Sequence, residues 1–168
     1  MKMKFVSGLF LLLVFAAVNV PAAPKADFNG KWMLDADKSE GLPKGMAQVM
    51  TIEQNGDALN VTTKVYPAND GLAGLGTDIY DLTGKETKFV AQRAGVPGEG
   101  KRKATWAEDR KGFNISEEAV VELKQGAVKT ETTRRWTLSD DGKMITIEIV
   151  TKDPQQGEIK SKRIFVKK

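Results

Sequence analysis

The sequence has no cysteine and no histidine among its 168 residues. Without cysteine the chain can form no disulfide, carry no lipid on a cysteine, and offer no thiolate to a metal or a substrate. Without histidine it lacks the usual general base at neutral pH and the commonest metal ligand. Most hydrolase mechanisms are therefore excluded, and we expect no cofactor, no metal site and no enzymatic activity.

A sustained helical period is also missing. Short runs of alternating apolar and polar residues follow one another instead, separated by turn residues, which is typical of all-β sandwiches and barrels. A short first strand is expected within 28–35. Further strands are expected at about 47–54, 58–66, 77–83, 86–93, 102–108, 112–123, 128–138, 144–152 and 159–167.

The N-terminus has the pattern of an export signal. Lys2 and Lys4 precede an uncharged apolar stretch from Phe5 to Val18, and small residues follow it. The stretch is shorter than the roughly 18–20 apolar residues of a transmembrane helix. We expect a signal peptide at 1–22 with cleavage after Ala22, or after Ala23 as the second choice. The domain at 23–168 is then secreted or periplasmic, is not a lipoprotein and has no stable membrane insertion.

The charge balance argues against a nucleic-acid partner. The 26 basic residues include Lys2 and Lys4, so 24 basic and 22 acidic residues remain beyond the expected signal peptide. Acidic residues lie between the basic clusters at 101–103 and 160–168. Solvated strand faces explain such a pattern better than a phosphate-binding surface.

Three hairpin turns predict strand registers. Asn55-Gly56, Gln125-Gly126 and Asp141-Gly142 each lie between alternating runs. Two-residue loops there would pair Ile52 with Leu59 and Met50 with Val61, Glu117 with Arg134, and Trp136 with Ile147. Each register gathers apolar residues on one face, whereas a slip of one residue would send them to the other face. Ile164 and Val166 are expected to join that face from the last strand.

The fold class expected is therefore all-β: a single antiparallel up-and-down meander of about eight to ten strands. A long sheet with one apolar face must close on itself or fold over, and closure also removes the exposed edges. We favour a barrel over a sandwich. The glycine-rich segments 67–76 and 94–100 are expected to border the mouth of its cavity.

Gly30-Lys31-Trp32 at the start of the first strand resembles the opening motif of the lipocalin and calycin superfamily. The segments Phe28–Trp32, Asp37–Ser39 and Trp136–Lys143 resemble a group of uncharacterised, secreted, lipocalin-like bacterial proteins. The resemblance implies a barrel whose floor is closed by Trp32 and a habit of binding small apolar molecules. In lipocalins an Arg before the end of the last strand stacks on that Trp, and Arg163 is the candidate here.

Glu117 and Arg134 are the polar residues expected on the apolar face. They form either a polar anchor inside a cavity or a structural ion pair. The expected ligand-binding residues are Glu117, Arg134, Trp106, Trp136, Met50, Val61, Ile115 and Ile147, with Ile52 beside them.

The function expected is an exported binding module that takes a small apolar or amphipathic molecule into the barrel. The alternative is a non-catalytic envelope interaction or structural protein with a solid core. An enzyme that uses Glu117 as acid or base is a third, less favoured possibility. The oligomeric state does not follow from the sequence.

Overall fold

Ten antiparallel strands form one sheet in residues 24–66 and 74–168, the part of the chain that this computed structural model describes. The strands are β1 (Gly30–Leu34), β2 (Ala47–Asn55), β3 (Ala58–Tyr66), β4 (Gly74–Asp81), β5 (Thr87–Arg93), β6 (Val96–Trp106), β7 (Gly112–Leu123), β8 (Gly126–Leu138), β9 (Met144–Asp153) and β10 (Gly157–Lys167). Their order across the sheet is β4-β3-β2-β1-β10-β9-β8-β7-β6-β5. The expected all-β barrel is confirmed. The expected signal peptide lies outside the described residues.

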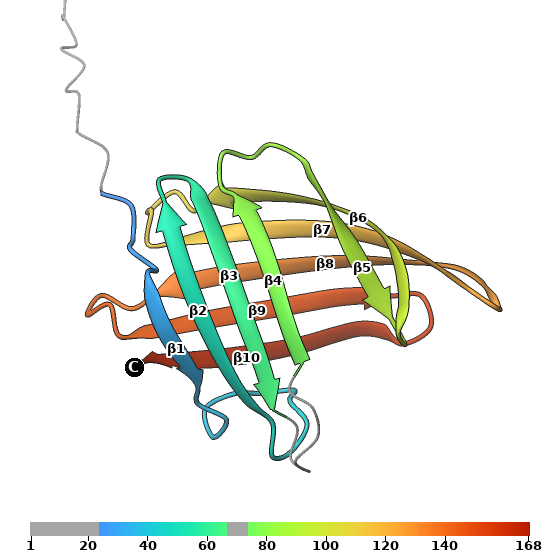
Figure 1. Ribbon diagram of the computed structural model, residues 1–168, viewed down its shortest axis with the longest axis horizontal. Coiled ribbons are helices and arrows are strands. Elements are labelled where there is room, and N and C mark those ends of the chain that lie inside the picture. Colours follow the sequence, from blue (N-terminus) through green and yellow to red (C-terminus); the bar gives the residue numbers. More distant parts are fainter. Residues whose placement is uncertain (1–23, 67–73) are drawn as a thin grey trace, which may run out of the picture.

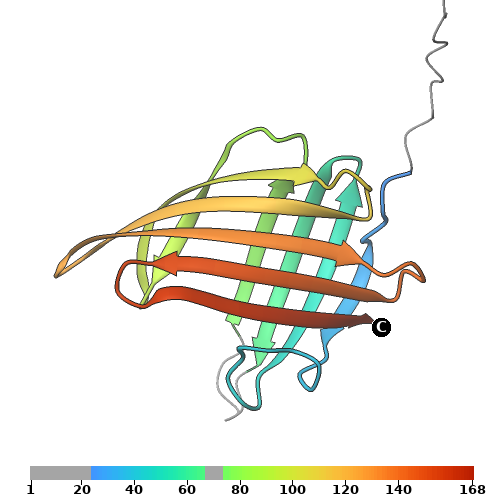
Figure 2. The ribbon, with the colours of Figure 1, turned by 180° about the vertical axis from the view of Figure 1, so that it is seen from behind.

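The sheet folds into two crossing layers (Figures 1 and 2). The strands β1 to β4 form one layer, and the long strands β6 to β10 run across behind it. Pairing of β1 with β10 joins the two layers at one side. Within the described ranges there is no helix long and apolar enough to cross a membrane.

The two edges of the sheet, β4 and β5, are not hydrogen-bonded to each other. The expectation that every pair of sequence neighbours would pair is therefore wrong at this one connection. The chain between them bonds to β6 instead: Gly84 N–H donates to the Ala104 carbonyl at 2.9 Å, and Thr83 forms a bridge with Thr105. The barrel is nearly closed, with one interruption in its hydrogen bonding.

Two of the three predicted registers are wrong by two residues, and the third is right. Ile52 faces Val61 instead of Leu59. Glu117 faces Thr132, while Arg134 faces Ile115. The turns are centred one residue away from the predicted positions, at 56–57 and 124–125. A slip of two residues keeps every side chain on its predicted face.

The prediction of which residues of the last strand face inward is wrong by one residue. Phe165 and Arg163 face Ile145 and Ile147 across the β9–β10 ladder and lie on the inner face. Ile164 and Val166 are on the outer side. Ile164 is nonetheless buried, because the β1–β2 connection bonds to its backbone through Asp35 and Ser39.

Trp32 closes one end of the barrel and is fully buried. Its indole Nε1 donates to the Phe28 carbonyl at 2.9 Å, and Lys167 Nζ lies 5.1 Å from its ring centroid. The cation over this ring is therefore Lys167 and not Arg163. The reason is the register, in which Trp32 pairs with Lys167.

The segment 94–100 is not a loop. Ala94 and Gly95 form a tight turn, and β6 begins at Val96. In the segment 67–76, residues 74–76 belong to β4, and 67–73 lie outside the described residues.

Two isoleucines of opposite exposure test which strand residues face the core. Ile115 on β7 is 2% exposed and Ile79 on β4 is 67% exposed. Ile115→Ala is expected to lower the free energy of unfolding by about 2–5 kcal/mol, because it leaves a cavity. Ile79→Ala is expected to change it by less than about 0.5 kcal/mol. Urea denaturation measures both, and equal losses would contradict the inward-facing assignment.

Candidate functional site

The inward face changes in character along the strands β7 to β10. At the end closed by Trp32 it is apolar and fully buried, with Phe113, Ile145 and Phe165. Further along each strand comes a layer of charged side chains, and beyond it many of the inward residues are small or polar, with Val121 and Val128 buried among them. The charged layer is made by Arg102, Glu117, Arg134 and Arg163.

Glu117 lies at the centre of this layer. Its side chain is 7% exposed, and both carboxylate oxygens face guanidinium groups. Oε2 accepts from Arg134 Nε and lies 3.0 Å from Nη2, while Oε1 lies 3.3 Å from Arg102 Nε. Burial is the largest single influence on the pKa of Arg134 and acts to lower it, but the charge and hydrogen bond of Glu117, together with Tyr80 and Asp78, raise that pKa overall. One carboxylate thus serves two arginines.

Arg102 connects the two unpaired edge strands. Its guanidinium donates to Asp78 Oδ1 on β4 at 2.8 Å. Its centre lies 4.9 Å from the ring centroid of Tyr80 on β4 and 4.0 Å from that of Phe89 on β5. Burial, with the nearby charge of Asp78, raises the pKa of Tyr80, so the phenol stays neutral. Arg102 therefore spans the interruption between β4 and β5 from inside.

Arg163 has no carboxylate partner within the described residues. Its one hydrogen bond goes to Gln48 Oε1, at 3.5 Å, and its buried Nε has no acceptor. Burial and the charge of Arg134 lower the pKa of Arg163. At ordinary pH it still carries its charge, because an arginine starts from a pKa above about 12. Three arginines and two carboxylates, Glu117 and Asp78, leave one positive charge in excess.

Beyond the charged layer several inward residues are short. Ala119, Thr132, Thr151 and Ser161 point inward by register and by the alternation of their strands, yet each is partly exposed. Ile159 faces Thr151 and is 42% exposed. Inward side chains that solvent reaches mark an accessible space at this end of the barrel.

The structure divides the predicted ligand-binding residues into two groups. Glu117 and Arg134 meet as predicted, although by a diagonal contact and not as directly facing residues. Trp106 is half-buried near the closed end, where its Nε1 donates to Asp57 at 2.7 Å. The other predicted residues are packed in the core: Met50, Val61, Ile115, Trp136 and Ile147, together with Ile52. Whether any of them touches a ligand stays a prediction.

Sequence reasoning missed Arg102 and Arg163 as members of the charged layer. Arg102 lies within a basic run that suggests a solvated face, yet its alternation with Ala104 and Trp106 placed it inward. Arg163 was hidden by the register of β10, since a one-residue error assigned Ile164 to the inside. Only the alternation of Gln48 with Met50 along the strand indicates that Gln48 points inward.

No protein-family model matches this chain, and no curated protein matches it. Two solved structures are similar to it in fold. One is secretory abundant heat soluble protein 4 from Ramazzottius varieornatus, at 13% identity and a TM-score of 0.50, with 87% of this chain and 99% of that chain covered. The other is zebrafish ileal bile acid-binding protein complexed with cholic acid, at 18% identity and a TM-score of 0.50, with 84% and 98% covered.

The fold that the chain shares with them is a nearly closed barrel of antiparallel strands. The ten strands, the joining of the first strand to the last and the unpaired edges β4 and β5 define it here. At these identities the similarity concerns the fold.

The shared carboxylate gives a direct test of the charged layer. Glu117→Ala leaves two arginines without their common partner and is expected to cost about 3–5 kcal/mol of stability. Its neighbour Glu118 points outward, is 64% exposed and pairs with Lys129 at 3.2 Å. Glu118→Ala is therefore expected to cost about 0–1 kcal/mol. Thermal or urea unfolding compares the two variants, and similar losses would contradict the buried network.

Proposed function

We propose that this protein binds a small amphipathic acid inside the barrel, with the acid group at Arg163. The observation that carries the proposal is the unpaired charge of Arg163, whose buried Nε has no acceptor in the described structure. A buried donor without a partner costs free energy, and a buried charge costs more. A ligand carboxylate would supply the missing acceptor.

The neighbouring groups support an anionic ligand. Glu117 is already shared between Arg102 and Arg134, so it does not compensate a third guanidinium. Arg134 is close enough to Arg163 to affect its pKa and has a side chain that is 29% exposed. Two guanidinium groups near one accessible space favour a carboxylate, since charge-assisted hydrogen bonds are stronger than neutral ones.

The rest of the ligand would occupy the open end of the barrel. There the short side chains Ala119, Thr132, Thr151 and Ser161 leave room beyond the charged layer, and Ile159 offers an exposed apolar surface. The packed apolar half would serve as the floor. Of the structures similar in fold, the zebrafish protein is complexed with cholic acid, an acid of the kind proposed here. Such binding requires no catalytic group.

The proposal is tested with dansyl-labelled undecanoic acid and its methyl ester. The protein is expected to enhance the fluorescence of the acid, and the enhancement is expected to saturate as the protein concentration rises. Arg163→Met is expected to weaken the affinity for the acid by about tenfold or more, through the loss of a charge-assisted hydrogen bond, and to change that for the ester little. The matched control is Arg135→Met, which removes an exposed arginine from the outer face of the same layer.

The same Arg163→Met variant separates a binding role from a structural one. Removal of a half-buried charge with no carboxylate partner and one unsatisfied donor is expected to raise the free energy of unfolding of the ligand-free protein by about 1–3 kcal/mol. A loss of stability would mean that Arg163 is a structural residue. Absence of any fluorescence change with the unsubstituted protein would favour the alternative, a solid barrel that acts through its surface.

We also propose that the protein is exported and acts outside the cytoplasm. The charged start, the apolar stretch and the small residues of 1–22 support this. Expression in an exporting bacterial host is expected to yield a protein whose intact mass corresponds to a chain starting at Ala23, or at Pro24 for the second choice of site. Recovery of the full 168-residue mass outside the cytoplasm would contradict the cleavage, and retention inside would contradict export.

A further inference from the structure

The outer faces of the two layers differ in chemistry. On the outer face of β6 to β9, basic and acidic residues alternate across the ladder, as with Lys152 opposite Glu131 and Arg135 opposite Glu148. On the outer face of β1 to β4, the strand residues at the end near Met33 include no acidic side chain. The two acidic residues on that face, Glu53 and Asp81, lie at the opposite end, beside the β2–β3 turn.

Apolar side chains form a continuous row at that end. The ladder places Val49 opposite Met33, Met33 opposite Val166, and Val166 opposite Met144, all on the outer side. Three of the large exposed apolar side chains lie at this end: Met33 in the row at 37%, Tyr66 on β3 at 42%, and Leu75 at 69% exposed, one strand beyond Lys64. Single exposed apolar residues are ordinary, but a row across adjacent strands indicates a contact surface.

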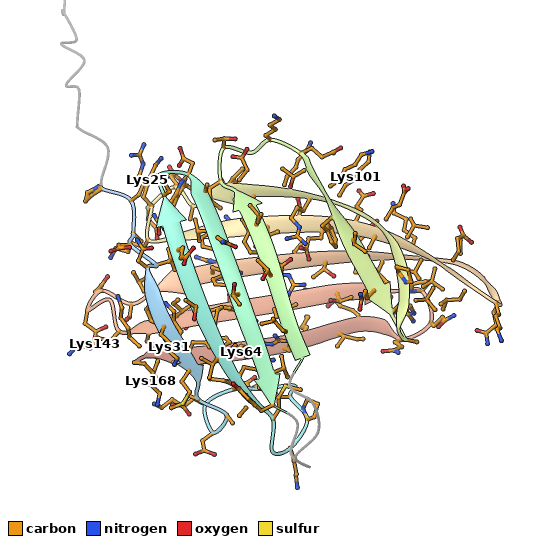
Figure 3. The ribbon with its side chains drawn as sticks, viewed as in Figure 1. Lys25, Lys31, Lys64, Lys101, Lys143 and Lys168 are labelled. Atoms are coloured by element: carbon orange, nitrogen blue, oxygen red, sulfur yellow. The ribbon has the colours of Figure 1, made fainter. Side chains whose placement is uncertain are left out.

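Lysines surround this row. Lys64 lies between Leu75 and Val49 in the ladder, and Lys31 is adjacent to Lys168, whose N–H donates to the Lys31 carbonyl at 2.9 Å. Figure 3 shows Lys31 and Lys64 on the layer formed by β1 to β4, and Lys168 below Lys31, just after the end of β10. Each is exposed, and none has an acidic group within ion-pair distance in the described structure. Beyond β1, Asp35 is neutralised by Lys38 at 2.9 Å.

We propose that this surface, made by Met33, Val49, Tyr66, Leu75, Lys31, Lys64 and Lys168, docks the protein on an anionic lipid bilayer. Lysines on long apolar stems can reach phosphate groups while the row of Met, Val, Tyr and Leu enters the interface. Tyrosine is enriched at the boundary between lipid and water. Charge and apolar surface together suit peripheral binding. The inference rests on the outer surface and is independent of what the interior binds.

A vesicle sedimentation assay tests the proposal with the chain from Ala23 to Lys168, which contains all ten strands and the whole described core. Binding to vesicles of phosphatidylglycerol and phosphatidylcholine is expected, with little binding to phosphatidylcholine alone. Each basic residue near an anionic surface contributes roughly fivefold to partitioning, so Lys31→Gln with Lys64→Gln is expected to lower it by roughly 25-fold. The control, Lys103→Gln with Lys152→Gln, removes the same charge from the other layer and is expected to lower it by less than roughly threefold.

A second pair of variants tests the apolar row without any change of charge. Leu75→Ser and Val90→Ser replace side chains of nearly equal exposure, 69% and 72%, on β4 and β5. Only Leu75→Ser is expected to weaken vesicle binding.

Two outcomes overturn the proposal. Equal losses of vesicle binding in the two double-lysine variants would mean that the charge of the whole protein attracts it to the vesicles unspecifically. Absence of binding to anionic vesicles at low salt would leave the surface to an acidic protein partner instead.

Discussion

The carboxylate of Glu117 is the interaction on which the interior depends. It is almost fully buried and lies against both Arg102 and Arg134. Burying a charge without a partner costs much free energy, so this carboxylate offsets the cost of holding both arginines inside the barrel. Because Glu117 is shared, it cannot also compensate Arg163. The unpaired charge that we assign to ligand binding is thus a consequence of how this one acid is used.

The same network of charged side chains connects the two unpaired edge strands of the barrel. The strands β4 and β5 exchange no hydrogen bonds, yet Arg102 pairs with Asp78 on one and packs on Phe89 of the other. Side chains therefore hold the interruption together where backbone bonds do not. Toward Trp32 the interior is apolar and tightly packed, and away from it short side chains leave space. The charged layer separates the two.

Alternation of apolar and polar residues was sufficient to predict most strands and which face of each strand is buried. It could not fix the pairing, since a shift of two residues leaves every face unchanged, as for Ile52 and Glu117. The glycines predicted two turn centres that are wrong by one position. Gly56 and Gly126 have positive φ, but the turns are centred at 56–57 and 124–125. The place of Arg163 in the charged layer was not predicted, because the sequence of the last turn, 153–158, does not fix the register of β10. The Glu117–Arg134 contact was predicted, and the excess of positive charge was not.

A binding barrel with an unpaired arginine should carry its ligand through purification under native conditions. The most direct test is a native mass spectrum of the protein recovered from its own cells. The account predicts a fraction of molecules with one bound small acid, which organic extraction releases and which Arg163→Met strongly reduces. A spectrum of bare chains, together with a crystal structure in which Arg163 is paired with a carboxylate of the protein itself, would contradict it.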